Sequence, residues 1–270
     1  MSSSHSDQAT GVTAPAGFRA AGVTAGLKPS GAADLALVVN DGPSSHAAAV
    51  FTSNRCKANP VLWSEQAIKT GSARAVVLNS GGANCYTGPE GFQTVHDTAE
   101  LAADLLGIGP IDVQVCSTGL IGLMNDRAVL LDGVRSAASA LTDDGGDDAA
   151  RAIMTTDTVS KQAVRTVDAP EGAFTIGGMA KGAGMLAPAL ATMLVVLTTD
   201  AVLTSEDLDE ALRRATGQSF DRLDSDGCQS TNDTVLLMAS GASGVTPDLD
   251  AFADALTDLC RDLALQLLAD

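Results

Sequence analysis

Short runs of apolar and β-branched residues recur along the chain and predict a set of strands. Each run is four to six residues long and is bounded by glycine, proline or polar residues, as is usual for strands. The predicted strands are Leu35–Val39, Ala47–Thr52, Ala73–Leu78, Asp112–Cys116, Phe174–Gly178, Met193–Leu197 and Val235–Met238.

Longer segments with apolar residues every three or four positions predict helices between these strands. Two of them are Pro89–Leu106 and Asn125–Ala140, although Gly133 weakens the second because glycine disfavours helix interiors. A third helix follows Thr204, whose side chain can cap it together with Asp207, three residues later.

The last predicted helix begins at Leu249 and reaches Asp270 without a glycine or asparagine cap and without a basic last turn. A helix that stops inside its apolar stripe looks interrupted, so we expect the chain to be truncated at this end. The stripe consists of Phe252, Leu256, Leu259, Leu263 and Leu267.

Because strands and helices alternate in mixed order, the pattern predicts an α/β fold with stacked mixed β-sheets flanked by helices. Residues 1–10 are expected to form a disordered tail. The acidic segment 141–150 could bind a cation, but a solvated turn leading into a helix at Ala149 is the favoured interpretation.

Composition and charge narrow the class of protein. Hydrophobic residues make up 45% of the 270 residues, and the net charge of −17 argues against binding to nucleic acid or to an anionic membrane. The sequence lacks a signal peptide and a run of about 20 apolar residues, so we expect a cytoplasmic protein. Five scattered cysteines indicate reduced thiols, and three isolated histidines predict neither a metal site nor a cofactor.

The segment KGAGMLAPALATML (181–194) holds the strongest candidate chemistry. Taken alone, Lys181 is a surface lysine and Thr192 is the first residue of a strand. If the chain is cut between Ala191 and Thr192, however, the new α-amino group, with a pKa of about 7.7–8.0, can act as the base for the Thr192 hydroxyl. That arrangement needs no histidine.

Four other polar segments are weaker candidates. VCSTGLIG (115–122) could supply backbone N–H groups to an oxyanion hole, and its Cys116 is more simply a small buried residue than a nucleophile. LNSGGANCYTG (78–88) lacks a phosphate-binding pattern and is expected to be a tight turn beside a site. IMTTDT (153–158) and DGCQSTNDTV (226–235) are turns of a kind that binds carboxylates or amides.

Together with VTAPAGFRAAGVTAGLK (12–28), these segments resemble, in the same order, the ornithine acetyltransferase family, also called bifunctional glutamate N-acetyltransferase (ArgJ). The resemblance spans residues 11–270. It implies a self-processing fold of the N-terminal-nucleophile type, cut at Ala191–Thr192 into an α-chain (11–191) and a β-chain. Residues 192–270 would be the N-terminal part of that β-chain.

The resemblance also implies roles for individual residues. Thr192 would be the nucleophile that carries the acetyl group. Thr118 and Gly119 would stabilise the oxyanion, and Thr155 and Lys181 would bind substrate together with Thr192. Acetyl would pass from N-acetylornithine to glutamate in a ping-pong reaction of arginine biosynthesis, with acetyl-CoA as a further donor in some members. The α and β pieces would assemble as a heterotetramer of two α and two β.

Family members continue for roughly another third of their length, with a Glu, an Asn and a Ser or Thr that contact substrate and have no counterpart here. One alternative is therefore an inactive remnant that binds ornithine or glutamate, or that pairs with a full-length copy. Another is a hydrolase that uses the same nucleophile with water as the acceptor.

Overall fold

The fold contains two β-sheets in the computed structural model, which describes residues 10–183, 193–223 and 229–270. The first sheet has four strands in the order β1-β2-β4-β5. Only β4 and β5 run parallel to each other. These strands are β1 (Phe18–Val23), β2 (Leu35–Asn40), β4 (Ala75–Asn79) and β5 (Val113–Ser117).

The second sheet has five strands in the order β3-β9-β8-β7-β6. Its neighbours are antiparallel except for β8 and β9, where Leu194 pairs with Thr234 in a parallel register. The strands are β3 (Ala47–Phe51), β6 (Lys161–Ala169), β7 (Gly172–Lys181), β8 (Leu194–Thr199) and β9 (Thr234–Ala239).

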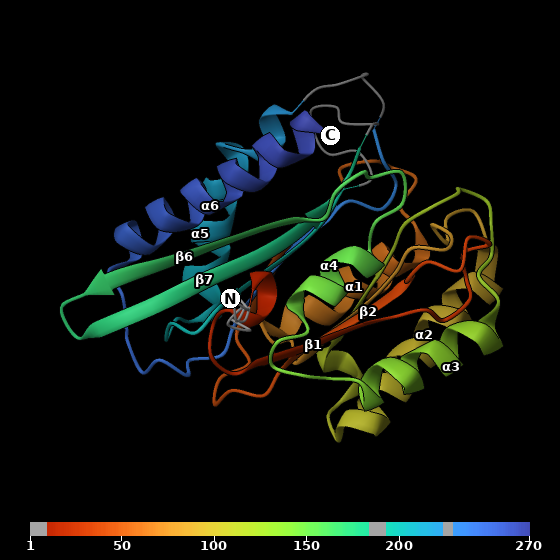
Figure 1. Cartoon of the computed structure of the whole chain (residues 1–270), viewed down its shortest axis with the longest axis horizontal. Helices are drawn as coiled ribbons and strands as arrows, with labels where there is room; N and C mark the ends of the chain where they lie inside the picture. Colours follow the sequence, from red (N-terminus) through yellow and green to blue (C-terminus); the bar gives the residue numbers. More distant parts are fainter. Residues whose placement is uncertain (1–9, 184–192, 224–228) are drawn as a thin grey trace, which may run out of the picture.

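Helices cover the outer faces of the two sheets, so the molecule has helix, sheet, sheet and helix layers (Figure 1). The pair α5 and α6 packs on the second sheet, while α2 and α3 pack on the first. The helices are α1 (Asn59–Ala67), α2 (Gly88–Leu106), α3 (Arg127–Ser139), α4 (Gly146–Ala152), α5 (Ser205–Gly217) and α6 (Leu249–Ala269). Short 3₁₀ turns lie at Gly11–Thr13, Ile68–Thr70, Pro110–Asp112 and Phe220–Arg222.

The space between the sheets is filled by apolar side chains, including Val38, Met179 and Leu236, which are fully or almost fully buried. Ala149 of helix α4 and Ile153, the residue that follows the helix, close this layer. The sheets therefore stack through an apolar core, which confirms the predicted α/β class with stacked sheets and outer helices. No helix in the described ranges is both long enough and apolar enough to cross a membrane.

The two C-terminal helices form as their sequence signals predict. Thr204 and Asp207 make a reciprocal capping box at the start of α5, which satisfies N–H groups that the first helical turn leaves unpaired. The predicted apolar stripe of α6 is buried against the second sheet and α5. Gly133 in α3 also has a packing reason, because a Cβ there would lie 2.4 Å from the Cβ of Ala25.

Several predicted boundaries were wrong. The acidic segment 141–150 is not all loop, since α4 begins at Gly146. The predicted strand Phe174–Gly178 is too short at both ends, because β7 runs from Gly172 to Lys181. Strands β1 and β6 and helix α1 were missed. The tail residues 1–9 lie outside the described residues.

Candidate functional site

A cavity of about 720 Å³ opens where several strand ends and loops meet. Thr118 and Gly119, which directly follow strand β5, line it, and strand β7 ends there at Lys181. Thr155, in the loop after α4, forms another part of the wall. The structure thus brings together four residues singled out in the sequence, although up to 63 positions separate them along the chain. The remaining lining residues are Lys28, Pro29, Ser30, Ser80, Gly81, Leu120, Thr156 and Ala183.

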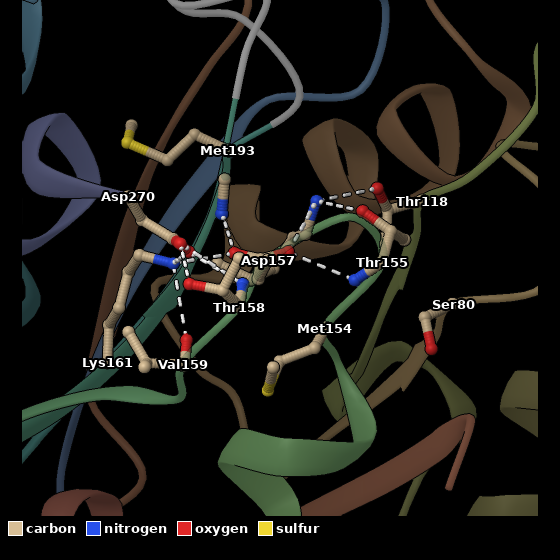
Figure 2. Close-up of polar contacts among 12 residues, drawn as sticks. Ser80, Thr118, Met154, Thr155, Asp157, Thr158, Val159, Lys161, Met193 and Asp270 are labelled. Atoms are coloured by element: carbon tan, nitrogen blue, oxygen red, sulfur yellow. Dashed lines mark hydrogen bonds and ion pairs between the residues drawn. The ribbon is translucent and has the colours of Figure 1, made fainter. Parts of the chain in front are cut away.

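Lys181 is almost fully buried at the wall of this cavity, so it is not the surface lysine of the simpler interpretation. Its Nζ atom donates to Oγ1 of Thr155 at 2.8 Å and to Oγ1 of Thr118 at 3.4 Å (Figure 2). Burial lowers the pKa of Lys181, and the nearby carboxylates of Asp157 and Asp233 counter that effect. A cation held between two hydroxyl groups is suited to binding a carboxylate.

The turn at Thr118 and Gly119 presents donors to the cavity. Gly119 has a φ of +127°, a conformation that side-chain-bearing residues rarely adopt. Its N–H group donates to no acceptor within the described residues. An N–H group in that state, next to a buried threonine hydroxyl, is the type of donor that an oxyanion hole requires.

Two other polar segments noted in the sequence, 78–88 and 226–235, hold this turn in place. Asn232 donates from Nδ2 to the carbonyl oxygens of Ala83 (2.6 Å) and Ser117 (2.8 Å). The hydroxyl of Ser117 donates to Oδ1 of Asn79 at 2.5 Å. The segment 78–88 lies beside the cavity, as predicted, through Ser80 and Gly81. It is not a tight turn, because residues 80–87 form a loop between β4 and α2, in which Asn84 has a positive φ of 51°.

A second lysine, Lys28, also lines the cavity. Its Nζ atom donates to the carbonyl oxygens of Ala33 (2.8 Å) and Met154 (2.6 Å), and burial lowers its pKa. The lysine therefore ties the N-terminal loop to the loop after α4. It was not singled out in the sequence because a single lysine does not form a motif with residues at a fixed spacing from it.

A buried ion-pair network behind Lys181 was also missed. Asp157 lies between Lys161 and Lys181, with Oδ1 2.8 Å from Nζ of Lys161 and Oδ2 3.6 Å from Nζ of Lys181. Lys161 also pairs with Asp270, at the end of α6, at 2.5 Å. Burial acts to raise the pKa of Asp157, but the two lysines and the backbone donors hold it at about 2. Asp157 belongs to the polar segment 153–158, whereas nothing in the sequence around Lys161 indicated a functional residue.

Asp233 is the second missed group. Its side chain is fully buried, and Oδ1 accepts a hydrogen bond from the N–H group of Met193. Oδ2 has no hydrogen-bond partner in the described chain. Burial raises the pKa of Asp233 to about 8, against the opposing effects of Met193 N–H, Ser230 and Lys181. The only sequence signal was its place in the polar segment 226–235.

Other expectations concern residues around the site. Cys116 is buried, and burial raises its pKa to about 12, as expected for a structural thiol. No group of three His, Cys, Asp or Glu side chains that could hold a metal ion occurs within the described ranges. Ala191 and Thr192, the predicted cleavage pair and nucleophile, lie outside the described residues, which resume at Met193.

The sequence pattern of the ArgJ family matches residues 19–270. The chain belongs to the ArgJ family. The arginine biosynthesis bifunctional protein ArgJ of Streptomyces coelicolor is 64% identical over 259 residues, and the ArgJ protein of Mycobacterium leprae is 59% identical over 270. These alignments cover 96% and 97% of the chain but 67% and 66% of the relatives, so the chain spans about two thirds of their length.

Solved structures agree with this family assignment. Ornithine acetyltransferase from Mycobacterium tuberculosis, solved with ornithine, matches with a TM-score of 0.64 and 57% identity. The match covers 67% of this chain and 96% of that one. An aminopeptidase and amidase from Ochrobactrum anthropi, described as a variant of the Ntn hydrolase fold, shares the fold with a TM-score of 0.58 at 16% identity, over 96% of this chain and 86% of its own.

Proposed function

We propose that this ArgJ-family chain carries the nucleophile-bearing part of a self-cleaving acetyltransferase of arginine biosynthesis, acting in the cytoplasm. Acetyl moves from N2-acetylornithine to glutamate, and acetyl-CoA is a second donor. The observation that carries the proposal is the cavity in which Thr118, Gly119, Thr155 and Lys181 meet. The names of the relatives and the ornithine complex of the M. tuberculosis protein support the choice of substrates.

In the proposed reaction, Thr192 attacks the acetyl carbonyl carbon of N2-acetylornithine. Its hydroxyl proton goes to its own α-amino group and then to the departing nitrogen as the C–N bond breaks. Ornithine leaves, and an acetyl-Thr192 ester remains. The amine of glutamate attacks that ester, loses a proton to the same α-amino group and leaves as N-acetylglutamate, so that the free threonine is restored.

The described residues supply what this reaction needs around the nucleophile. Lys181 pairs with Leu194 in the register of β7 and β8, so it lies beside the strand that follows Thr192 in the sequence. Its ammonium group would bind the substrate α-carboxylate with the help of Thr155. The Thr118 hydroxyl and the Gly119 N–H group would stabilise the negative charge on the carbonyl oxygen, where one donor is typically worth about 10²–10³ in rate.

The chain would form an α piece up to Ala191 and a β piece from Thr192, assembled as two of each. The match to the M. tuberculosis chain covers 96% of that chain but 67% of this one. That 67% is close to the share of this chain that precedes Thr192, which is consistent with a separate α piece. The Ntn-type fold shared with the O. anthropi protein is consistent with self-processing.

The first test is the intact mass of the purified chain under denaturing conditions, followed by an acetyl-transfer assay with N2-acetylornithine and glutamate. We expect two pieces divided at Ala191–Thr192 and the formation of N-acetylglutamate. The Thr192→Ala variant should remain a single 27.2 kDa species without transfer, whereas Thr192→Ser should retain both activities. Normal transfer by the alanine variant would exclude Thr192 as the nucleophile. If N2-acetylornithine loses its acetyl group as fast without glutamate as with it, the protein is a hydrolase.

A further inference from the structure

The carboxylate of Asp157 is shared by two buried cations. Lys161 begins β6 and pairs in register with Ala180, so its side chain lies next to the end of β7, where Lys181 is located. The side chains of Asp157 and Lys161 have no exposed surface, and that of Lys181 is 3% exposed. Charges buried to this degree are stable only with partners.

The two oxygens of Asp157 have different partners. Oδ1 accepts from Nζ of Lys161 at 2.8 Å and from the N–H group of Gly182 at 2.6 Å. Oδ2 accepts from the N–H group of Thr155 at 3.0 Å and lies 3.6 Å from Nζ of Lys181. Asp157 therefore fixes the backbone at Gly182, which follows Lys181, and at Thr155, whose hydroxyl accepts from that lysine (Figure 2).

Lys161 does not depend on Asp157 alone for charge compensation, because it also forms an ion pair with a second carboxylate. Oδ2 of Asp270 lies 2.5 Å from its Nζ atom, and Asp270 also accepts hydrogen bonds from Thr158. One carboxylate thus balances Lys161 from the α6 side, and Asp157 remains to balance Lys181. Among the described residues, the charged groups that act on Lys181 are Asp157, Lys161 and Asp233.

We infer that Asp157 is a positioning residue that holds the ammonium group of Lys181 charged and aligned on Thr155 at the cavity wall. The inference rests on the proposed function, in which Lys181 binds the substrate carboxylate. A lysine buried this deeply would otherwise tend to lose its proton, because burial disfavours the charged form. Asp157 counters that tendency, whereas the like charge of Lys161 adds to it.

The direct test is the titration of Lys181 itself, followed by NMR of the side-chain Cε and Nζ nuclei in lysine-labelled protein. Lys181→Arg assigns the signal. In Asp157→Asn we expect the titration midpoint of Lys181 to fall by about 1–3 pH units, the usual effect of an opposite charge within 4–6 Å. Asp270→Asn is the matched control, because Asp270 contacts Lys161 but not Lys181. It should lower the Lys181 midpoint by less than Asp157→Asn does, because it acts on Lys181 only through Lys161.

Lys161→Gln should shift the Lys181 midpoint in the opposite direction. This variant provides the test if Asp157→Asn does not fold. Removing that like charge should raise the Lys181 midpoint. An unchanged midpoint in Asp157→Asn, or an equal fall in Asp270→Asn, would overturn the inference, as would a lower midpoint in Lys161→Gln.

The kinetic readout is separate from this titration. Asp157→Asn should raise KM for N2-acetylornithine more than it lowers kcat, and the alkaline limb of kcat/KM should move to lower pH. If the unaltered protein transfers no acetyl group, the proposed function fails, but the titration still decides whether Asp157 controls Lys181. If transfer is normal and the titration does not respond, only the role of Asp157 fails.

Discussion

The N–H group of Met193 donates a hydrogen bond of 2.6 Å to Oδ1 of Asp233, a fully buried side chain. The bond connects the residue before β8 to the residue before β9. It also joins a carboxyl group to the residue that directly follows the proposed nucleophile in the sequence. Oδ2 has no hydrogen-bond partner in the described chain, so Asp233 is held by this contact, by its interaction with Ser230 and by its buried surroundings.

The pKa of about 8 for Asp233 predicts a pH-dependent stability. A carboxyl whose pKa is raised from 3.8 on folding stabilises the protein below pH 4, and this contribution is lost as the pH rises through about 8. We expect Asp233→Asn, which retains an oxygen acceptor for Met193, to lose stability less steeply between pH 5 and pH 9. Thermal unfolding of the unaltered protein and of Asp233→Asn across this pH range tests the prediction. Asp168→Asn, at an exposed position, is the control. If stability changes equally steeply with pH in all three proteins, Asp233 is not the group responsible.

The hydroxyl of Thr118 is expected to act directly in acetyl transfer. Thr118→Val removes the hydroxyl and keeps the branched shape, so kcat should fall by about 10²–10³, the usual loss for one oxyanion donor. Thr118→Ser should keep most of the activity because it keeps the donor. Steady-state kinetics with N2-acetylornithine and glutamate measure the difference. An unchanged kcat in the valine variant would remove Thr118 from the proposed machinery.

Gly119 is expected to tolerate no side chain. Its φ of +127° is unfavourable for alanine, and a Cβ atom would lie 2.9 Å from the carbonyl oxygen of Gly81, which is backbone and cannot rotate away. Gly119→Ala should therefore lower the melting temperature and abolish transfer, since strain of this kind costs about 1–3 kcal/mol even before the clash.

Gly122→Ala is the matched control for this prediction. Gly122 also has a positive φ, +84°, but a Cβ atom there would meet nothing within 4 Å. It should lose less stability than Gly119→Ala and retain the cavity. Equal losses in the two variants would show that the backbone conformation matters at Gly119 and the close approach to Gly81 does not.

The missed elements have physical explanations. Strand β6 is an edge strand in which partly buried and exposed residues alternate, so its sequence has no run of apolar residues. The alternation of side chains with a period of two around Val164 was the only sign of a strand there. Helix α1 has only nine residues, too few for a clear helical period, although the proline in its first turn was a usable start signal. Strand β1 was hidden by the glycines around it, where Gly22 approaches the backbone of Asp148 closely.

The sequence by itself determined the local elements and the family. The period of α6, the capping box of α5 and the apolar runs of the central strands are encoded within a few residues of one another, so they can be recognised without the fold. The ordered motifs indicated the ArgJ family, and they pointed to Thr118, Gly119, Thr155 and Lys181.

Only the tertiary structure decided which charges are buried and what they contact. Asp157, Lys161 and Asp233 look like ordinary polar residues in the sequence, because charged side chains are usually solvated. Their burial follows from the meeting of strand ends and loops far apart in the chain, such as Asp157 beside Gly182 and Asp233 beside Met193. Local sequence patterns do not encode such long-range contacts, yet these contacts determine the charge state of the cavity.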